Sequence, residues 1–176
     1  LYGATYPGTD KTQFVKIDLD QTRRRGLLTQ LSVMATLTKD SAVQDLGTAI
    51  RRGKFVLQQI LCRPVPEPRA ALTAPFQPLA LTHTTRSQAG VHENSPVCST
   101  CHTSIDPLGL PFENYDMIGR WRDTDQNMPI DARVQILDSS NANPAKFNGV
   151  PELAQLIATR DETRACYLQQ WFQFSN

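Results

Sequence analysis

The sequence predicts a mainly α-helical fold with a minor β-hairpin, and two patterns carry that prediction. Apolar residues recur at helical spacing in residues 27–35, 48–62 and 151–172. One later stretch, residues 130–136, alternates apolar and polar side chains as a half-buried strand does. Helical segments therefore outnumber strand segments, and a short return strand at residues 145–149 would complete a small hairpin.

The N-terminal part begins with a second alternating stretch, residues 14–20, which predicts a strand with Val15, Ile17 and Leu19 facing inward. The helix predicted over residues 27–35 is preceded by three arginines, residues 23–25. Such a cluster suits an acidic or phosphate-bearing partner, although a solvated positive end is its commoner role. Arginine is poorly placed for the dipole at a helix N-terminus, so a pairing role also stays open.

The helix predicted over residues 48–62 ends at Cys62, because the prolines that follow cannot continue it. Prolines recur from Pro64 to Pro78 and predict a long Pro-rich connector that runs extended along a surface. We therefore divide the chain into an N-terminal helical lobe with its connector, residues 1–75, and a second domain, residues 76–176.

The strongest motif is C-S-T-C-H at residues 98–102. Two thiols one helical turn apart can each bond to one vinyl group of the same haem, and His102 then lies beneath the iron as its axial ligand. This C-x-x-C-H spacing is the signature of c-type haem attachment. A zinc half-site would need a second ligand pair, and a redox dithiol would need a βαβ context, neither of which the sequence offers. The motif predicts one covalently attached haem c, held by Cys98 and Cys101.

The segment after the motif, residues 104–112, is rich in proline and glycine and predicts a loop. Four of its side chains are too apolar for a loop in water, and we expect them to line the haem: Ile105, Leu108, Leu110 and Phe112. A backbone carbonyl near Pro107 or Pro111 would accept the Nδ1 proton of His102.

Two arginines flank a tryptophan at residues 120–122. Haem propionates are carboxylates, which Arg120, Arg122 and the indole N–H of Trp121 would satisfy. The alternative is a surface network that joins these residues to Asp116 and Asp123.

The last part of the chain contains the predicted hairpin and two helices. Pro151 opens the first helix, where its missing N–H is harmless. The second follows Arg160 and carries an aromatic stripe, which predicts a core-facing side.

The second axial ligand of the iron has several candidates, of which His92 is the first choice. Six extended residues reach about 20 Å, enough to pass from one haem face to the other, and Pro96 favours that extended path. The alternatives are Met117, which would raise the reduction potential, and then Met128, His83 and Met34.

Two further cysteines, Cys62 and Cys166, are an even remainder in a protein whose cofactor is normally attached outside the cytoplasm. Parity and compartment favour a disulfide between them, and two separately buried thiols are the alternative. With a net charge of +1, the chain has no strong positive field that would attract nucleic acid. No apolar run is long enough to span a membrane. The chain begins at Leu1, which suggests a mature product or a piece of a longer protein.

Residues 51–68, 92–125, 130–132 and 147–153 together resemble the cytochrome-c-like C-terminal region of large secreted proteins of planctomycetes and myxobacteria, most of them catalogued as domains of unknown function. The resemblance runs from about Arg25 to Arg164. It implies a secreted or periplasmic protein with one covalent haem, a histidine at the position of His92, and paired cysteines at Cys62 and Cys166. Met117 departs from the small residue usual in that family.

The sequence therefore predicts a cytochrome-c-like haem domain, periplasmic or extracellular, that transfers electrons to and from redox partner proteins or other subunits of an assembly. No independent catalytic motif is present, which favours a carrier over a catalyst. Two alternatives stay open: a peroxidase-like haem enzyme with an open sixth coordination position, and a structural subunit that relays electrons inside a complex.

Overall fold

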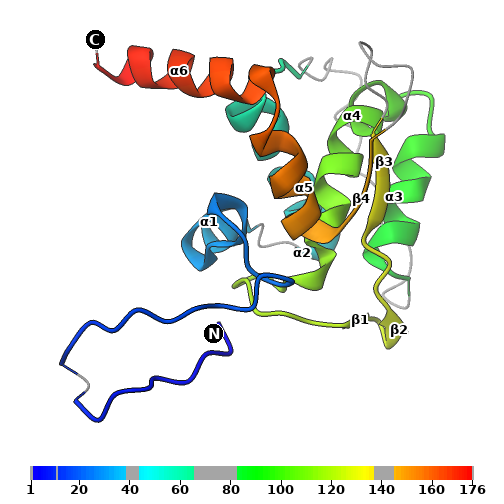
Figure 1. The fold of residues 1–176 in the computed structure, drawn as a ribbon. Helices are drawn as coiled ribbons and strands as arrows, with labels where there is room; N and C mark the ends of the chain where they lie inside the picture. The colour runs from blue at the N-terminus through cyan, green and yellow to red at the C-terminus, as the bar shows by residue number, and fades with distance from the viewer. Residues whose placement is uncertain (1, 11, 39–43, 66–82, 137–144, 176) are drawn as a thin grey trace.

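The computed structural model describes residues 2–10, 12–38, 44–65, 83–136 and 145–175. Figure 1 shows a mainly helical molecule with two small antiparallel hairpins, which confirms the predicted fold class. The helices are η1 (Leu27–Thr29), α1 (Leu31–Thr36), α2 (Gln44–Phe55), η2 (Val56–Ile60), α3 (Thr85–Asn94), α4 (Ser99–Gly109), η4 (Leu110–Asn114), α5 (Gly149–Ala158) and α6 (Asp161–Ser175). Within the described residues, no helix combines the length and the apolar character that a membrane span requires.

Helices α2 and α4 cross at two glycines, and this crossing positions the C-x-x-C-H motif. A Cβ atom on Gly53 would collide with the backbone carbonyl oxygen of Ile105, and one on Gly109 would collide with that of Ala49. Only glycine allows two helix backbones to approach so closely. The end of α4 that follows the motif is thereby fixed against α2.

One hydrophobic core joins segments from both halves of the chain. It contains Val56 and Leu57 of η2, Ile105 and Leu108 of α4, and Leu153 of α5, all buried. The predicted domain boundary at residue 75 lies outside the described residues.

Both hairpins are short. The predicted one pairs β3 (Arg133–Ile136) with β4 (Ala145–Asn148) and places buried Phe147 opposite Val134. The other hairpin, β1 (Thr124–Asp125) with β2 (Met128–Pro129), was not predicted from the sequence. Its turn residues, Gln126 and Asn127, have φ values of 50° and 62°, as the tight turns that join two-residue hairpins require.

The strand predicted over residues 14–20 is wrong. The backbone there has no strand partner among the described residues, and Val15 and Ile17, which were predicted to face inward, are exposed. An alternating pattern of apolar and polar residues forms a strand only where a neighbouring strand pairs with it through backbone hydrogen bonds. The helix predicted over residues 27–35 is present as two short pieces, η1 and α1, which bury Leu28 and Met34.

The arginines that precede η1 have partners inside the molecule. Arg24 is buried and donates to the carbonyl oxygens of Gly119, at 2.7 Å, and Thr29, at 3.2 Å. Arg23 lies over the ring of Trp121, with 5.0 Å between its guanidinium carbon and the ring centroid. Arg23 and Arg24 therefore have partners within the protein, which is the pairing role that the sequence left open.

The loop predicted over residues 104–112 is also wrong, because α4 continues through Pro107 to Gly109 and passes into η4. Gly109 serves the close approach to α2 rather than a turn. The apolar side chains of this segment are buried: Ile105, Leu108 and Phe112 in the hydrophobic core, and Leu110 in a smaller cluster beside it.

Helix α6 differs from its prediction in what it buries. Its backbone is helical as expected, but the aromatic stripe lies in solvent instead of in a core: Tyr167 is 66% exposed, Trp171 60% and Phe172 69%. Cys166 is the one α6 residue of the buried core. In Figure 1 the C-terminal end of α6, in red, extends away from the other helices.

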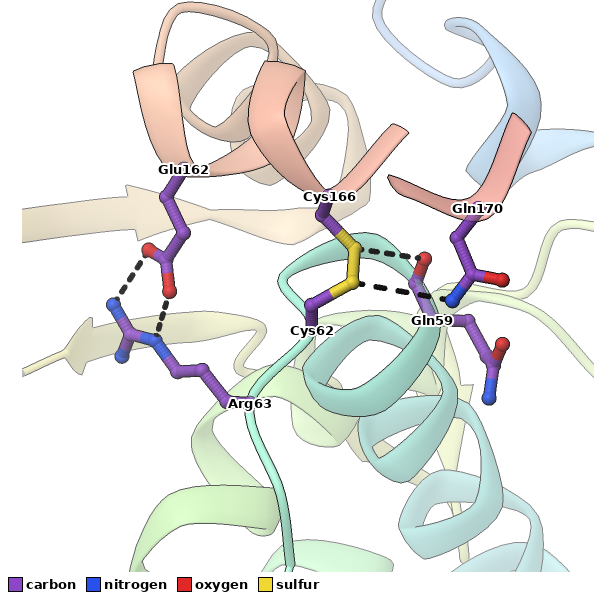
Figure 2. The surroundings of a disulfide bond; sticks show 6 residues. All are labelled: Gln59, Cys62, Arg63, Glu162, Cys166 and Gln170. Atoms are coloured by element: carbon purple, nitrogen blue, oxygen red, sulfur yellow. Dashed lines mark hydrogen bonds and ion pairs between the residues drawn. A yellow bond between two sulfur atoms is a disulfide. The ribbon is translucent and has the colours of Figure 1, made fainter. Parts of the chain in front are cut away.

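The predicted disulfide is present and attaches α6 to the end of η2. Cys62 and Cys166 are bonded, with 5.4 Å between their Cα atoms. Figure 2 shows an ion pair beside it, in which Arg63 donates to the two carboxylate oxygens of Glu162 at 2.5 and 2.7 Å. Cys62 itself adopts a left-handed backbone conformation, with a φ of 50°, which ends the helical segment.

Candidate functional site

The C-x-x-C-H motif occupies the first turn of α4. Cys98 precedes the first helical residue, and its carbonyl oxygen accepts hydrogen bonds from the N–H groups of Cys101, at 3.2 Å, and His102, at 3.1 Å. Residues three and four apart on a helix lie on the same face. The two thiols and the imidazole therefore share one side of the helix.

The three side chains are neither fully buried nor fully exposed. Cys98 and Cys101 are half-buried and form no disulfide, although the other two cysteines of the chain are bonded to each other. Cys101 packs against the edge of the hydrophobic core. The side chain of His102 is 19% exposed. A planar ligand could thus approach these groups from solvent while it contacts apolar atoms.

The imidazole of His102 is held from behind by a carboxylate. Its Nδ1 lies 2.9 Å from Oδ1 of Asp106, which is four residues on and therefore on the same face of α4. A carboxylate acceptor places the proton on Nδ1 and leaves Nε2 as the nitrogen with a lone pair for a metal. The acceptor was predicted to be a backbone carbonyl near Pro107 or Pro111, and the carboxylate of Asp106 corrects that prediction.

Asp106 is the site residue that the sequence analysis missed. Its side chain is 2% exposed, and its second oxygen, Oδ2, is buried with no hydrogen-bond partner among the described residues. The signal was the spacing of four between His102 and Asp106. That spacing has meaning only on a helix, and residues 104–112 were expected to form a loop.

A second acidic group approaches the motif from α3. Burial and the negative charge of Asp106 raise the pKa of Glu93, and the nearby Arg86 and His102 act against that rise. Glu93 thus belongs to the same electrostatic environment as His102 and Asp106.

A cavity of about 580 Å³ lies along α4 beside the motif. Ser104 and Leu108 line it, and they follow Cys101 by three and seven residues, so they lie on the face of α4 that carries Cys101. Glu93 and two arginines, Arg63 and Arg160, add charged groups to a largely apolar wall. A volume of this size accommodates a ligand with a large apolar body and a few polar groups, which describes a haem. A larger apolar cavity, about 800 Å³, lies between η1, η2, α5 and α6. Neither cavity is lined by Cys98, Cys101 or His102, but the smaller one begins at Thr103, directly after the motif.

The donors of the motif fit a haem better than they fit the zinc alternative. Within the described ranges, no three histidine, cysteine, aspartate or glutamate side chains are grouped as a metal-ion site. A structural zinc site needs four protein ligands. A haem brings four nitrogens of its own and asks the protein only for axial ligands and points of attachment.

The structure changes the geometry assumed for His92. The backbone of His92 belongs to α3, which runs to Asn94, and Ser95 then accepts hydrogen bonds from the N–H groups of Cys98 and Ser99. The extended path predicted between His92 and Cys98 is therefore wrong. Proline is tolerated in the first turn of a helix, so Pro96 fits this tight connection between α3 and α4. The side chain of His92 lies outside the described part of the structure, and its role as ligand stays a prediction.

The other candidates for the second ligand are spread over the fold. Met128 is exposed on β2, Met34 is fully buried in the core, and Met117 follows η4 in a turn closed by the N–H of Gly119. His83 is exposed in the segment before α3.

The residues predicted to bind propionates make contacts within the protein. Arg120 donates to Asp116 at 2.7 Å, and the indole N–H of Trp121 donates to Asp123 at 2.7 Å. Arg122 donates to the carbonyl oxygen of Glu113 at 2.7 Å. The first two contacts belong to the surface network with Asp116 and Asp123 that was the alternative, whereas the contact of Arg122 does not. Binding of propionates by these residues stays a prediction.

Comparison with known proteins gives one match. Residues 24–125 match the family model PSCyt3, a protein of unknown function (DUF1588). No curated protein and no solved structure matches the chain. The matched residues are more than half of the chain, and they contain α2, α3, α4 and the whole C-x-x-C-H motif. The chain is accordingly a member of the PSCyt3 (DUF1588) family.

Proposed function

We propose that the chain is a mono-haem c-type cytochrome domain that transfers single electrons outside the cytoplasm, as part of a larger protein or complex. The observation that carries the proposal is the first turn of α4, which presents Cys98, Cys101 and His102 on one side. The two cysteines would hold the haem through thioethers, and His102 would be its proximal ligand. The haem would supply one-electron redox chemistry, with a potential set by its ligands and surroundings.

The chain's own residues have separate tasks in this proposal. Asp106 orients the His102 ring through Nδ1, so that Nε2 is the nitrogen directed to iron. Leu108 and the apolar wall of the neighbouring cavity exclude water from one side of the ligand. Arg63 and Arg160 at the same cavity supply positive charge that suits carboxylates of the ligand.

The disulfide supports a location outside the cytoplasm, because such bonds persist in oxidising compartments and are rare in reducing ones. The partners would be redox proteins or other subunits of an assembly. The cytochrome-like name of the matching family agrees with this function without establishing it.

Covalent attachment is the property to test first. The chain would be exported to the periplasm of bacteria that express a cytochrome c maturation system, and the purified protein would be run on a denaturing gel and stained for haem. We expect the stain to coincide with the polypeptide in the wild type and in the matched control Ser99→Ala, and to be lost in Cys98→Ala/Cys101→Ala. Complete removal of haem from the wild type by acid acetone would contradict the proposal.

One observation favours the enzymatic alternative. A carboxylate behind the proximal histidine increases the electron density on the ligand, which assists chemistry at oxidised iron as well as electron transfer. The spin state of the resting protein distinguishes the two functions. A low-spin, six-coordinate spectrum supports the carrier, whereas a high-spin spectrum with peroxide turnover well above that of free haem supports the enzyme.

A further inference from the structure

The acceptor behind His102 is charged, whereas the acceptor predicted from the sequence is neutral. Oδ1 of Asp106 lies 2.9 Å from Nδ1 of His102, and the carboxylate is almost completely shielded from water. Its other oxygen, Oδ2, has no donor among the described residues. Among the described residues, Asp106 forms no ion pair with a lysine or an arginine, and His102 is its hydrogen-bond partner.

Two effects of this arrangement both favour the oxidised state of a haem iron bound to His102. A carboxylate draws the Nδ1 proton more strongly than a peptide carbonyl does, so it increases the basicity of Nε2 and its donation to iron. Oxidised iron also carries one more positive charge than reduced iron, and a nearby negative charge therefore stabilises the oxidised state more. Burial strengthens this interaction, because little water is present to screen it.

Charged groups of both signs lie near Asp106 and His102. Glu93, from α3, adds a second carboxyl group close to both His102 and Asp106. Arg86 is the cation that acts on Glu93, and its guanidinium donates at 2.8 Å and 3.0 Å to the carbonyl oxygens of Asp131 and Arg133. Glu93 is exposed whereas Asp106 is buried, so the charge of Asp106 is the one that water screens less.

We propose that Asp106 is a positioning residue that lowers the reduction potential of the iron by placing a buried negative charge on the proximal ligand His102. This inference rests on the proposed function, since it concerns the haem that His102 would bind. The inference also specifies the kind of partner. A lower potential makes the reduced domain a stronger reductant, so it would reduce a given acceptor more completely than a domain with a neutral carbonyl behind the histidine. One electron moves in each transfer, and no bond is made or broken.

The substitution Asp106→Asn tests the charge with little change in shape, because the amide oxygen can still accept from Nδ1. In a potentiometric titration of the purified haem protein, we expect the ratio of ferrous to ferric protein at a fixed ambient potential to rise at least tenfold. For a one-electron couple this corresponds to about 59 mV. The matched control is Asp161→Asn, which removes the same charge from an exposed position on α6, where Asp161 pairs with Arg164. The control should leave the ratio unchanged.

A second measurement applies even if Asp106→Asn assembles poorly. Resonance Raman spectroscopy after photolysis of the carbon monoxide adduct reports the stretching frequency of the bond between iron and histidine. We expect the wild type to have a higher frequency than c-type haems whose histidine donates to a carbonyl, and Asp106→Asn, where it assembles, to have a lower frequency than the wild type.

The outcomes separate this inference from the proposed function. If the wild type carries covalent haem but neither its frequency nor the potential of the variant differs as stated, the role of Asp106 is overturned and the cytochrome function stands. If haem staining of the wild type is negative, both are overturned together. A merely structural role for Asp106 would change stability without these two spectroscopic and electrochemical shifts.

Discussion

Gly53 of α2 and Gly109 of α4 lie at the point where the two helices cross, and neither has room for a methyl group. Each would place a Cβ atom against a backbone carbonyl oxygen of the other helix, and backbone cannot move aside as a flexible side chain can. The crossing therefore fixes the helix that carries Cys98, Cys101 and His102 to the largest helix of the N-terminal half.

The substitution Gly109→Ala should lower the free energy of unfolding by about 1–3 kcal/mol, the usual cost of overpacking a tight contact. Gly90→Ala is the matched control, because Gly90 is also helical and its added Cβ would meet nothing within 4 Å. Alanine is the better helix former, so the control should gain up to about 1 kcal/mol. Urea denaturation followed by circular dichroism measures both, and equal stabilities of the two variants would contradict the close approach.

The sequence predicted part of the regular structure, since periodicity reports directly on local backbone geometry, but it did not predict α3 or the hairpin of β1 and β2. Helices α2 and α5 and the pairing of β3 with β4 lie where the patterns placed them. Periodicity does not report what covers an apolar face. For that reason one face of residues 14–20 and the aromatic stripe of α6 were predicted to face a core, although Val15, Ile17 and Trp171 are exposed.

The prediction of the site had a different weakness. Pro107 and Gly109 were interpreted as signals of a loop, whereas α4 accommodates both, and Gly109 is there for its contact with α2. Once that segment is a helix, Asp106 lies one turn after His102 and becomes its partner. The C-x-x-C-H motif could be identified from the sequence because its spacing alone defines it. The role of Asp106 could not, because it depends on the segment being a helix.

The disulfide should supply a large part of the stability of the native chain. Cys62 and Cys166 are separated by 104 residues, and a bond that closes so long a loop removes much of the conformational entropy of the unfolded state. The double variant Cys62→Ala/Cys166→Ala should lose about 2–5 kcal/mol in the free energy of unfolding.

Dithiothreitol provides the control for that experiment. It should lower the urea midpoint of the wild type and leave that of the double variant unchanged. Alkylation of both thiols in the unreduced, unfolded wild type would contradict the bond.

His92 remains the first candidate for the second axial ligand, now from a helical position on α3. In the haem protein, His92→Ala should convert the ferric spectrum from low-spin to high-spin and open the reduced iron to carbon monoxide, since a strong-field ligand is lost. His83→Ala is the matched control and should leave the spectrum as in the wild type. An unchanged spectrum in His92→Ala, or a charge-transfer band from sulfur to iron in the wild type, would transfer the role to a methionine, with Met117 the first to test.

The surface pair of Asp131 and Arg133 predicts a small dependence of stability on pH. Arg133 donates to both carboxylate oxygens of Asp131, at 2.8 and 3.0 Å, and lowers the pKa of that carboxyl from 3.8 to about 2. Because the folded pKa lies below the unfolded one, the pair stabilises the protein above about pH 4, and this contribution is lost as the pH falls toward 2. Both side chains are exposed, at 77% for Arg133 and 44% for Asp131, so the contribution should stay below about 1 kcal/mol.

Urea midpoints of the wild type and Asp131→Asn, measured between pH 6 and pH 2.5, test this dependence. The wild type should be the more stable protein at pH 6, and the difference should shrink steadily below pH 4, where protonation of Asp131 removes the charge in the wild type as well. At pH 6, added salt at about 1 M should also reduce the difference, because it screens exposed charges over a few ångströms. A difference that stayed constant across this pH range would mean that the charge of Asp131 contributes nothing, and that the variant acts only through the shape of the loop before β3.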